Sequence, residues 1–214
     1  SPPPASLGAA GGRAMEAPPP PPPLHTRAIR FEFTETRQPN RELQLQELQL
    51  FSTADGSNPL RIQHVANPGG RSPLKQLPHR LFDSDTASAA SKFVDLNMPS
   101  TGKSVLEVAL HHGAHDIAAY ELFTANDVPG RDPTTWHVYA LAAGDKEWKL
   151  VHSMVGVLPP LARFASYGRI PLSPAASLPA SEAEHQPHAV LPADARWFET
   201  ASPVPPPPAP PSKP

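Results

Sequence analysis

The chain of 214 residues contains no cysteine. Disulfides, thiolate nucleophiles and cysteine metal ligands are therefore excluded. No apolar run approaches the roughly 20 residues of a membrane-spanning helix, so no span is expected. The formal net charge is −2, the sequence pI is about 6.5 and no basic stripe is present. A nucleic-acid-binding protein would carry such a stripe, so no nucleic-acid partner is expected.

Enzyme signatures are also missing. The sequence has no G-x-S-x-G, no H-E-x-x-H and no glycine-rich phosphate loop, so we predict that the chain is not an enzyme. His111, His112 and His115 lie close enough in sequence to suggest zinc. Neighbouring residues of a strand point to opposite faces, however, so we interpret these histidines as loop or edge residues. His115 remains a candidate ligand contact.

The 32 prolines divide the chain into three parts. Nine lie in residues 1–26 and thirteen in 171–214, which leaves ten in the 144 residues between. Proline fixes φ and removes a backbone donor, so segments dense in proline cannot build sheets or helices. We therefore predict a disordered proline-rich arm over 1–26, one domain over 27–170 and a disordered tail over 171–214.

Within 27–170 the apolar residues mostly alternate with polar ones. Phe31 and Phe33 alternate with Glu32 and Thr34, which is typical of a half-buried strand. Residues 43–51 alternate in two pieces whose phase slips by one residue, which favours two strand pieces joined by a bulge over a helix. Further alternating or apolar runs, with turn signals between them, predict an all-β sandwich or barrel: 105–110, 120–124, 136–140, 148–151 and 164–170.

One block of sequence resembles a known family. Residues 123–136 contain A-N-D-V-P-G-R-D-P followed by Trp136, and then come Gly144-Asp145 and Trp148. This order resembles the galactose-binding-like (discoidin, coagulation factor V/VIII C-type) domains, which are related to carbohydrate-binding modules. The resemblance covers roughly residues 27–170. It implies an antiparallel jelly-roll β-sandwich whose ligands are glycans, lipid headgroups or proteins.

The loop in that block is the first candidate binding site. Pro129-Gly130 suits a type II turn, and Arg131 offers a planar fork of donors that Asp127 or Asp132 could accept. Such a fork, together with an amide, also suits the hydroxyls of a sugar. The alternative is a loop pinned by its own ion pairs. The predicted ligand-binding residues are Asn126, Asp127, Arg131, Asp132, Asn67 and His115.

A second candidate is a cation site. Asp83 and Asp85 are spaced as two oxygen ligands of one loop, and relatives by resemblance often hold one structural calcium near this point. The alternative is a solvated turn without metal. Trp136, by contrast, alternates with Val138 and is expected to face the core.

The predicted function is non-catalytic recognition of a glycan or glycoprotein through loops at one end of the sandwich. The alternative is a scaffold module of a larger assembly of protein subunits, whose proline-rich arms contact neighbouring subunits. Residues 195–199 contain Trp197-Phe198, a pair that either packs on the domain or docks on a partner. The proline-rich arms are similar in composition to extracellular, wall-associated proteins, which slightly favours a location at the cell surface or outside it.

Overall fold

The computed structural model describes residues 23–172 of the chain. Strands dominate, and one short α-helix and two 3-10 turns complete the regular structure of these residues. The strands are β1 (Leu24–Thr26), β2 (Ala28–Thr36), β3 (Leu43–Leu45), β4 (Glu47–Phe51), β5 (Ile62–Ala66), β6 (Phe93–Asp95), β7 (Ser104–Leu110), β8 (His115–Ile117), β9 (Ala119–Phe123), β10 (Pro133–Leu141), β11 (Lys149–Met154) and β12 (Ser166–Pro171). The other elements are η1 (Pro78–Phe82), α1 (Met98–Thr101) and η2 (Pro129–Arg131).

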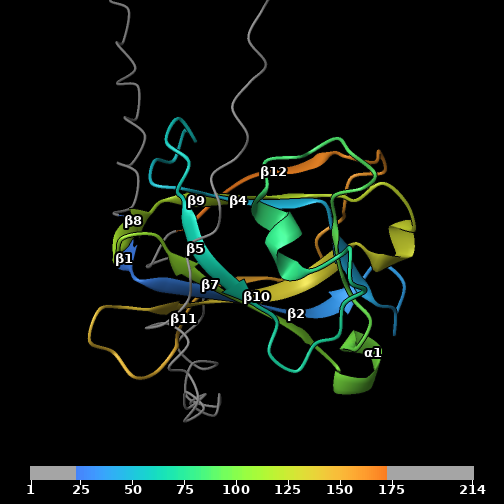
Figure 1. Cartoon of the computed structure of the whole chain (residues 1–214), viewed down its shortest axis with the longest axis horizontal. Coiled ribbons are helices and arrows are strands. Elements are labelled where there is room, and N and C mark those ends of the chain that lie inside the picture. The colour runs from blue at the N-terminus through green and yellow to red at the C-terminus, as the bar shows by residue number, and fades with distance from the viewer. Residues whose placement is uncertain (1–22, 173–214) are drawn as a thin grey trace, which may run out of the picture.

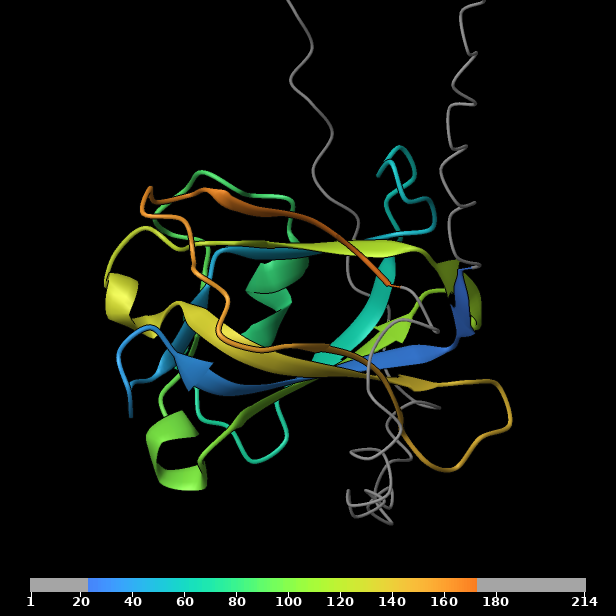
Figure 2. The same cartoon turned by 180° about the vertical axis from the view of Figure 1, so that it is seen from behind.

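Two antiparallel sheets face each other. A five-stranded sheet has the order β11-β10-β2-β7-β5, and a three-stranded sheet has the order β12-β9-β4. Figures 1 and 2 show both nearly edge-on, one above the other. The pairs β1-β8 and β3-β6 are also antiparallel. The expectation of an all-β, sandwich-like architecture is confirmed.

The core lies between the sheets and contains the residues that alternation predicted. Phe31, Phe33 and Trp136 are fully buried. The Phe31 ring meets that of Tyr120 edge-on, with 5.2 Å between their centroids. Trp136 Nε1 donates to the Tyr120 hydroxyl at 2.8 Å, so the buried indole keeps a hydrogen-bond partner. The inward position predicted for Trp136 is confirmed.

The phase slip within residues 43–51 separates β3 from β4. Gln46 lies between the two strands, and its amide N–H donates to Phe123 O at 2.9 Å. β3 then pairs with β6, whereas β4 pairs with β9 of the three-stranded sheet. The predicted break is thus the point where the chain passes from one sheet to another.

Trp148, the second tryptophan of the family-like block, packs outside this core. It forms a separate small cluster with Ala28 and Leu141. The guanidinium of Arg30 lies 4.5 Å from the centroid of the Trp148 ring and pairs with Glu107. A buried ion pair and an aromatic ring therefore cover part of the outer face of the five-stranded sheet.

The folded part begins earlier than the proline count predicted. Residues 24–26 form β1 and pair with β8, although they fall within the predicted arm. A run of three residues is too short to show an alternation of apolar and polar residues. The prolines directly before it therefore determined the prediction. At the other end Pro171 belongs to β12 and Leu172 is buried. The rest of both predicted arms, with residues 195–199, lies outside the described residues.

Loops gather at each end of the sandwich. The segments 37–42, 67–103, 124–132 and 155–165 meet at the end where β2, β5 and β9 finish, which we call the loop end. In Figure 1 this end lies on the right, with α1 below it. Within residues 23–172 no helix is long and apolar enough to cross a membrane.

Candidate binding surface at the loop end

The A-N-D-V-P-G-R-D-P segment lies at the loop end, as predicted, but its turn differs from the prediction. Pro129–Arg131 forms a 3-10 turn, and Gly130 is not among the glycines with positive φ that a type II turn requires. The prediction of a type II turn is therefore wrong. Gly130 packs closely against Gln38 instead, because a Cβ there would lie 2.8 Å from Gln38 Oε1, at the end of an exposed side chain.

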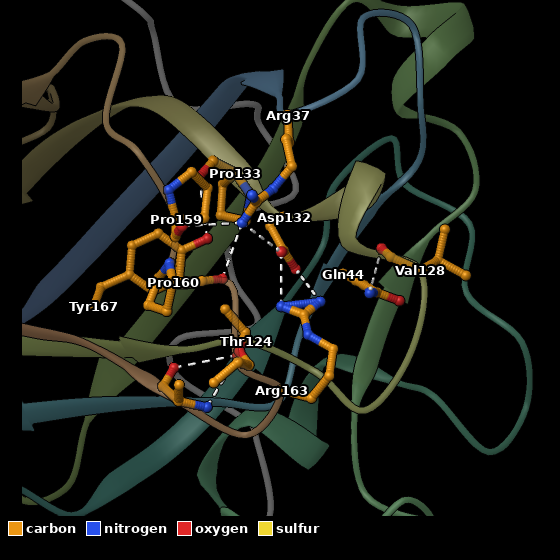
Figure 3. Close-up of polar contacts among 12 residues, drawn as sticks. Arg37, Gln44, Thr124, Val128, Asp132, Pro133, Pro159, Pro160, Arg163 and Tyr167 are labelled. Carbon is orange, nitrogen blue, oxygen red and sulfur yellow. Dashed lines mark hydrogen bonds and ion pairs between the residues drawn. The ribbon is translucent and has the colours of Figure 1, made fainter.

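Asp132 is the best-connected side chain of this segment (Figure 3). Its carboxylate is fully buried and accepts from Arg163 at 3.0 and 2.7 Å and from Arg37 at 3.3 Å. Burial raises the pKa of Asp132 to about 6, against the influence of both guanidinium groups and the Gln44 amide. The carboxylate thereby joins the end of β2, the start of β10 and the segment after β11.

Arg131 and Asp127 also form ion pairs, but with distant partners. Arg131 Nε donates to Glu42 Oε2 at 3.1 Å. The Arg131 guanidinium therefore pairs with neither Asp127 nor Asp132, the two carboxylates that the sequence suggested for it. The pKa of Glu42 is lowered, mainly by a backbone hydrogen bond. The neighbouring guanidinium groups of Arg131 and Arg41 lower it further. Lys92 Nζ donates to Asp127 Oδ2 at 2.6 Å. These contacts are those of a loop pinned by ion pairs.

The two asparagines lie at the same end, whereas His115 does not. Asn67 Nδ2 donates to Asp95 Oδ2 at 3.1 Å. Asn126 is half-buried, and its Oδ1 accepts no hydrogen bond from the described residues. His115 lies in β8 near the opposite end, where its Nε2 is 2.7 Å from His111 O. The structure therefore does not bring His115 together with the other predicted ligand-binding residues.

Asp83 and Asp85 follow η1 in a tight turn. Asp83 Oδ1 accepts from the Asp85 amide at 3.1 Å, and its Oδ2 accepts from Ser91. Asp85 Oδ1 accepts from the Ser88 amide at 2.8 Å. Within residues 23–172 no three His, Asp or Glu side chains are grouped so as to hold a metal ion. Calcium binding at this turn stays a prediction.

Glu47 is a carboxyl group that the sequence did not single out. It is buried beside that turn and accepts from the Ser84 amide at 3.1 Å, while its Oε2 has no hydrogen-bond partner. Burial and the neighbouring Asp83 and Asp85 raise the pKa of Glu47 to about 9. The sequence did offer one signal that Glu47 is buried, namely its position at the start of β4, directly after the phase slip.

A loop with exposed apolar side chains was also missed. The exposed fractions are 74% for Val155, 92% for Leu158 and 85% for Leu161. We call residues 155–161 the recognition loop. Its sequence, V-G-V-L-P-P-L, offered a signal, because two prolines in an apolar run rule out a strand interior and leave the leucines outside the core.

The recognition loop is held by the rest of the loop end. Val157 N–H donates to Thr134 O at 2.8 Å, and Arg37 Nη2 donates to Pro159 O at 3.0 Å and to Pro160 O at 2.9 Å (Figure 3). Just beyond the loop, Arg163 is bound to Asp132. The buried ion-pair cluster therefore positions the exposed leucines.

No protein-family model, curated protein or solved structure matches this chain.

Proposed function

We propose that this chain is a non-catalytic recognition module with a galactose-binding-like jelly-roll fold, and that the recognition loop binds a protein. The observation that carries the proposal is the exposure of Val155, Leu158 and Leu161 within seven residues. Several exposed apolar side chains gathered on one loop are a feature of interaction sites. The loop is also pre-organised by its backbone hydrogen bonds and two prolines, which lowers the entropic cost of binding.

Protein is favoured over glycan by two features of the loop end. Arg131 and Asp127, which would face a sugar, are already held in ion pairs with Glu42 and Lys92. A sugar ring also needs an aromatic face. The large apolar side chains that are exposed within residues 23–172 are three leucines and a valine, none of them aromatic.

The test compares paired leucine variants in one capture experiment. The full chain, the double variant Leu158→Asp with Leu161→Asp, and the control Leu74→Asp are each used to capture proteins by cross-linking. Leu74 is a suitable control because it is 87% exposed but lies outside the recognition loop. A partner bound by the wild type and the control, and lost by the double variant, would support the proposal.

A glycan array with and without calcium serves as the competing arm. Glycan binding that survives in the leucine double variant, in the absence of any captured protein, would overturn the protein proposal. The glycan interpretation would then replace it.

A further inference from the structure

β2 extends further than one of its two neighbours. On one side β10 pairs with β2 as far as Thr36, opposite Pro133. On the other side β7 begins at Ser104, which is opposite Phe33. No backbone hydrogen bond from another described segment reaches residues 34–36 on this second side. The last three residues of β2 therefore present an open strand edge.

The open edge lines a cleft of about 380 Å³. One wall is the turn after β2, the other is α1, and α1 lies beside the end of β2 in both views (Figures 1 and 2). The lining residues are Thr34, Glu35, Thr36, Pro39, Asn40, Arg41, Met98, Pro99 and Gly102.

Two contacts near the start of β7 hold the chain in a course that does not close the open edge of β2. Gly102 ends α1 with a left-handed φ of 73°, and its N–H donates to Met98 O at 2.9 Å. At the first residue of β7, Ser104 Oγ donates to Asp95 Oδ2 at 2.6 Å. The chain therefore turns away from β2 before it could pair with Thr34.

Arg41 supplies a cation to the cleft. Its Nε is buried and lies 3.5 Å from Glu42 Oε2, while Glu42 accepts a closer contact from Arg131. The Arg41 side chain is nevertheless 37% exposed. Glu35 also lines the cleft, but its Oε2 accepts from Thr135 Oγ1 at 2.8 Å. The guanidinium of Arg41 is thus positioned to take a further carboxylate.

We propose that this cleft binds an extended acidic peptide of a partner protein, which adds a strand to β2 along residues 34–36. The open edge provides main-chain donors and acceptors, the pattern that an extended peptide satisfies. The exposed Pro39 and Pro99 provide apolar contacts for alternate side chains, and Arg41 binds an acidic one. The site is separate from the recognition loop and goes beyond the function proposed for it.

The probe is an array of synthetic seven-residue peptides, rich in Val and Thr, with one Glu at each position in turn and matched Gln and Lys versions. The full chain should prefer Glu peptides. Arg41→Ala should weaken binding about tenfold, whereas Arg61→Ala, at the opposite end, should not change it. N-methylation of alternate peptide amides should abolish binding, because strand addition uses those N–H groups.

Bound peptide should also slow hydrogen exchange at those amides of residues 34–36 that do not face β10. Binding that ignores N-methylation or Arg41→Ala, or no peptide binding at millimolar concentration, would overturn the proposal. The double variant Leu158→Asp with Leu161→Asp separates the two proposals, since it should leave peptide binding intact even if the recognition loop binds nothing.

Discussion

Asp132 shows how a single buried carboxylate can order a surface. It holds Arg37 and Arg163, which come from segments far apart in the sequence. Burial raises the pKa of Asp132 to about 6, so the ionised carboxylate depends on both cations. Removing one cation would leave a buried charge with poorer compensation.

We therefore expect Arg163→Ala to lower the free energy of unfolding by about 3 kcal/mol at pH 8. The loss should be smaller at pH 5, because a carboxyl with a pKa of about 6 is mostly protonated there already in the wild type, and even more so without Arg163, so little buried charge is left uncompensated. Urea denaturation at the two pH values measures this difference. Arg61→Ala, an exposed arginine, should have little effect at either pH; an equal loss for Arg163→Ala at both would contradict the argument.

Glu47 predicts a different pH dependence. Its pKa is raised from 4.5 to about 9 by burial and by Asp83 and Asp85, so the folded protein favours the neutral form. The stabilising contribution is complete below pH 4.5 and is lost as the pH rises through 9. Glu47→Gln should therefore gain stability relative to the wild type between pH 5 and pH 9, by urea denaturation.

At the scale of single residues, the sequence predicted which side chains make polar contacts but not which partners they contact. Arg131 was expected to pair with a carboxylate of its own loop, yet Glu42 accepts it. Lys92 and Arg163 are likewise remote from Asp127 and Asp132 in the sequence. Only the tertiary fold brings such pairs together, so local spacing could not reveal them.

Among the elements, the break between β3 and β4 has a clear structural role. Gln46 is fully buried at the break, and its Nε2 donates to Asp85 O at 2.8 Å and to Ser88 O at 2.9 Å. The Gln46 side chain thereby connects the sheets to the turn that contains Asp83 and Asp85, the two predicted calcium ligands.

Gln46→Ala should leave those two carbonyls without their donor and cost about 1–3 kcal/mol of unfolding free energy. Hydrogen–deuterium exchange should increase over residues 83–91 and stay unchanged in the recognition loop. A matched variant is Gln49→Ala, which changes a half-buried glutamine of β4. Equal exchange increases in both variants would show that the turn is not held by Gln46.

Strands with a buried face were predictable from alternation, whereas most three-residue strands, other than β3, were not. β2, β7, β9, β10 and β12 contain clear apolar positions and were expected close to where they lie. β6 and β8 have three residues each, too few to show a period. β5 has no fully buried residue, because it is the edge strand of its sheet.

At the scale of the whole molecule, residues near the two ends of the described range make contacts that composition does not show. Thr26 Oγ1 donates to Leu141 O at 2.8 Å and accepts from the Leu141 amide at 3.1 Å. Leu172 is 2% exposed, and its N–H donates to Ala118 O at 2.9 Å. Both residues lie just outside 27–170, the range that the proline distribution predicted for the domain.

Two fragments measure what those terminal contacts contribute. The fragment 23–172 should unfold in one cooperative transition, since the main core spans both large sheets. The fragment 27–170 lacks β1 and Leu172 and should be less stable by about 3 kcal/mol, from one lost apolar side chain and several hydrogen bonds. Calorimetry should then record a transition temperature lower by about 9 °C. Identical transitions would mean that the domain ends where the prolines thin out, and that β1 adds nothing to its stability.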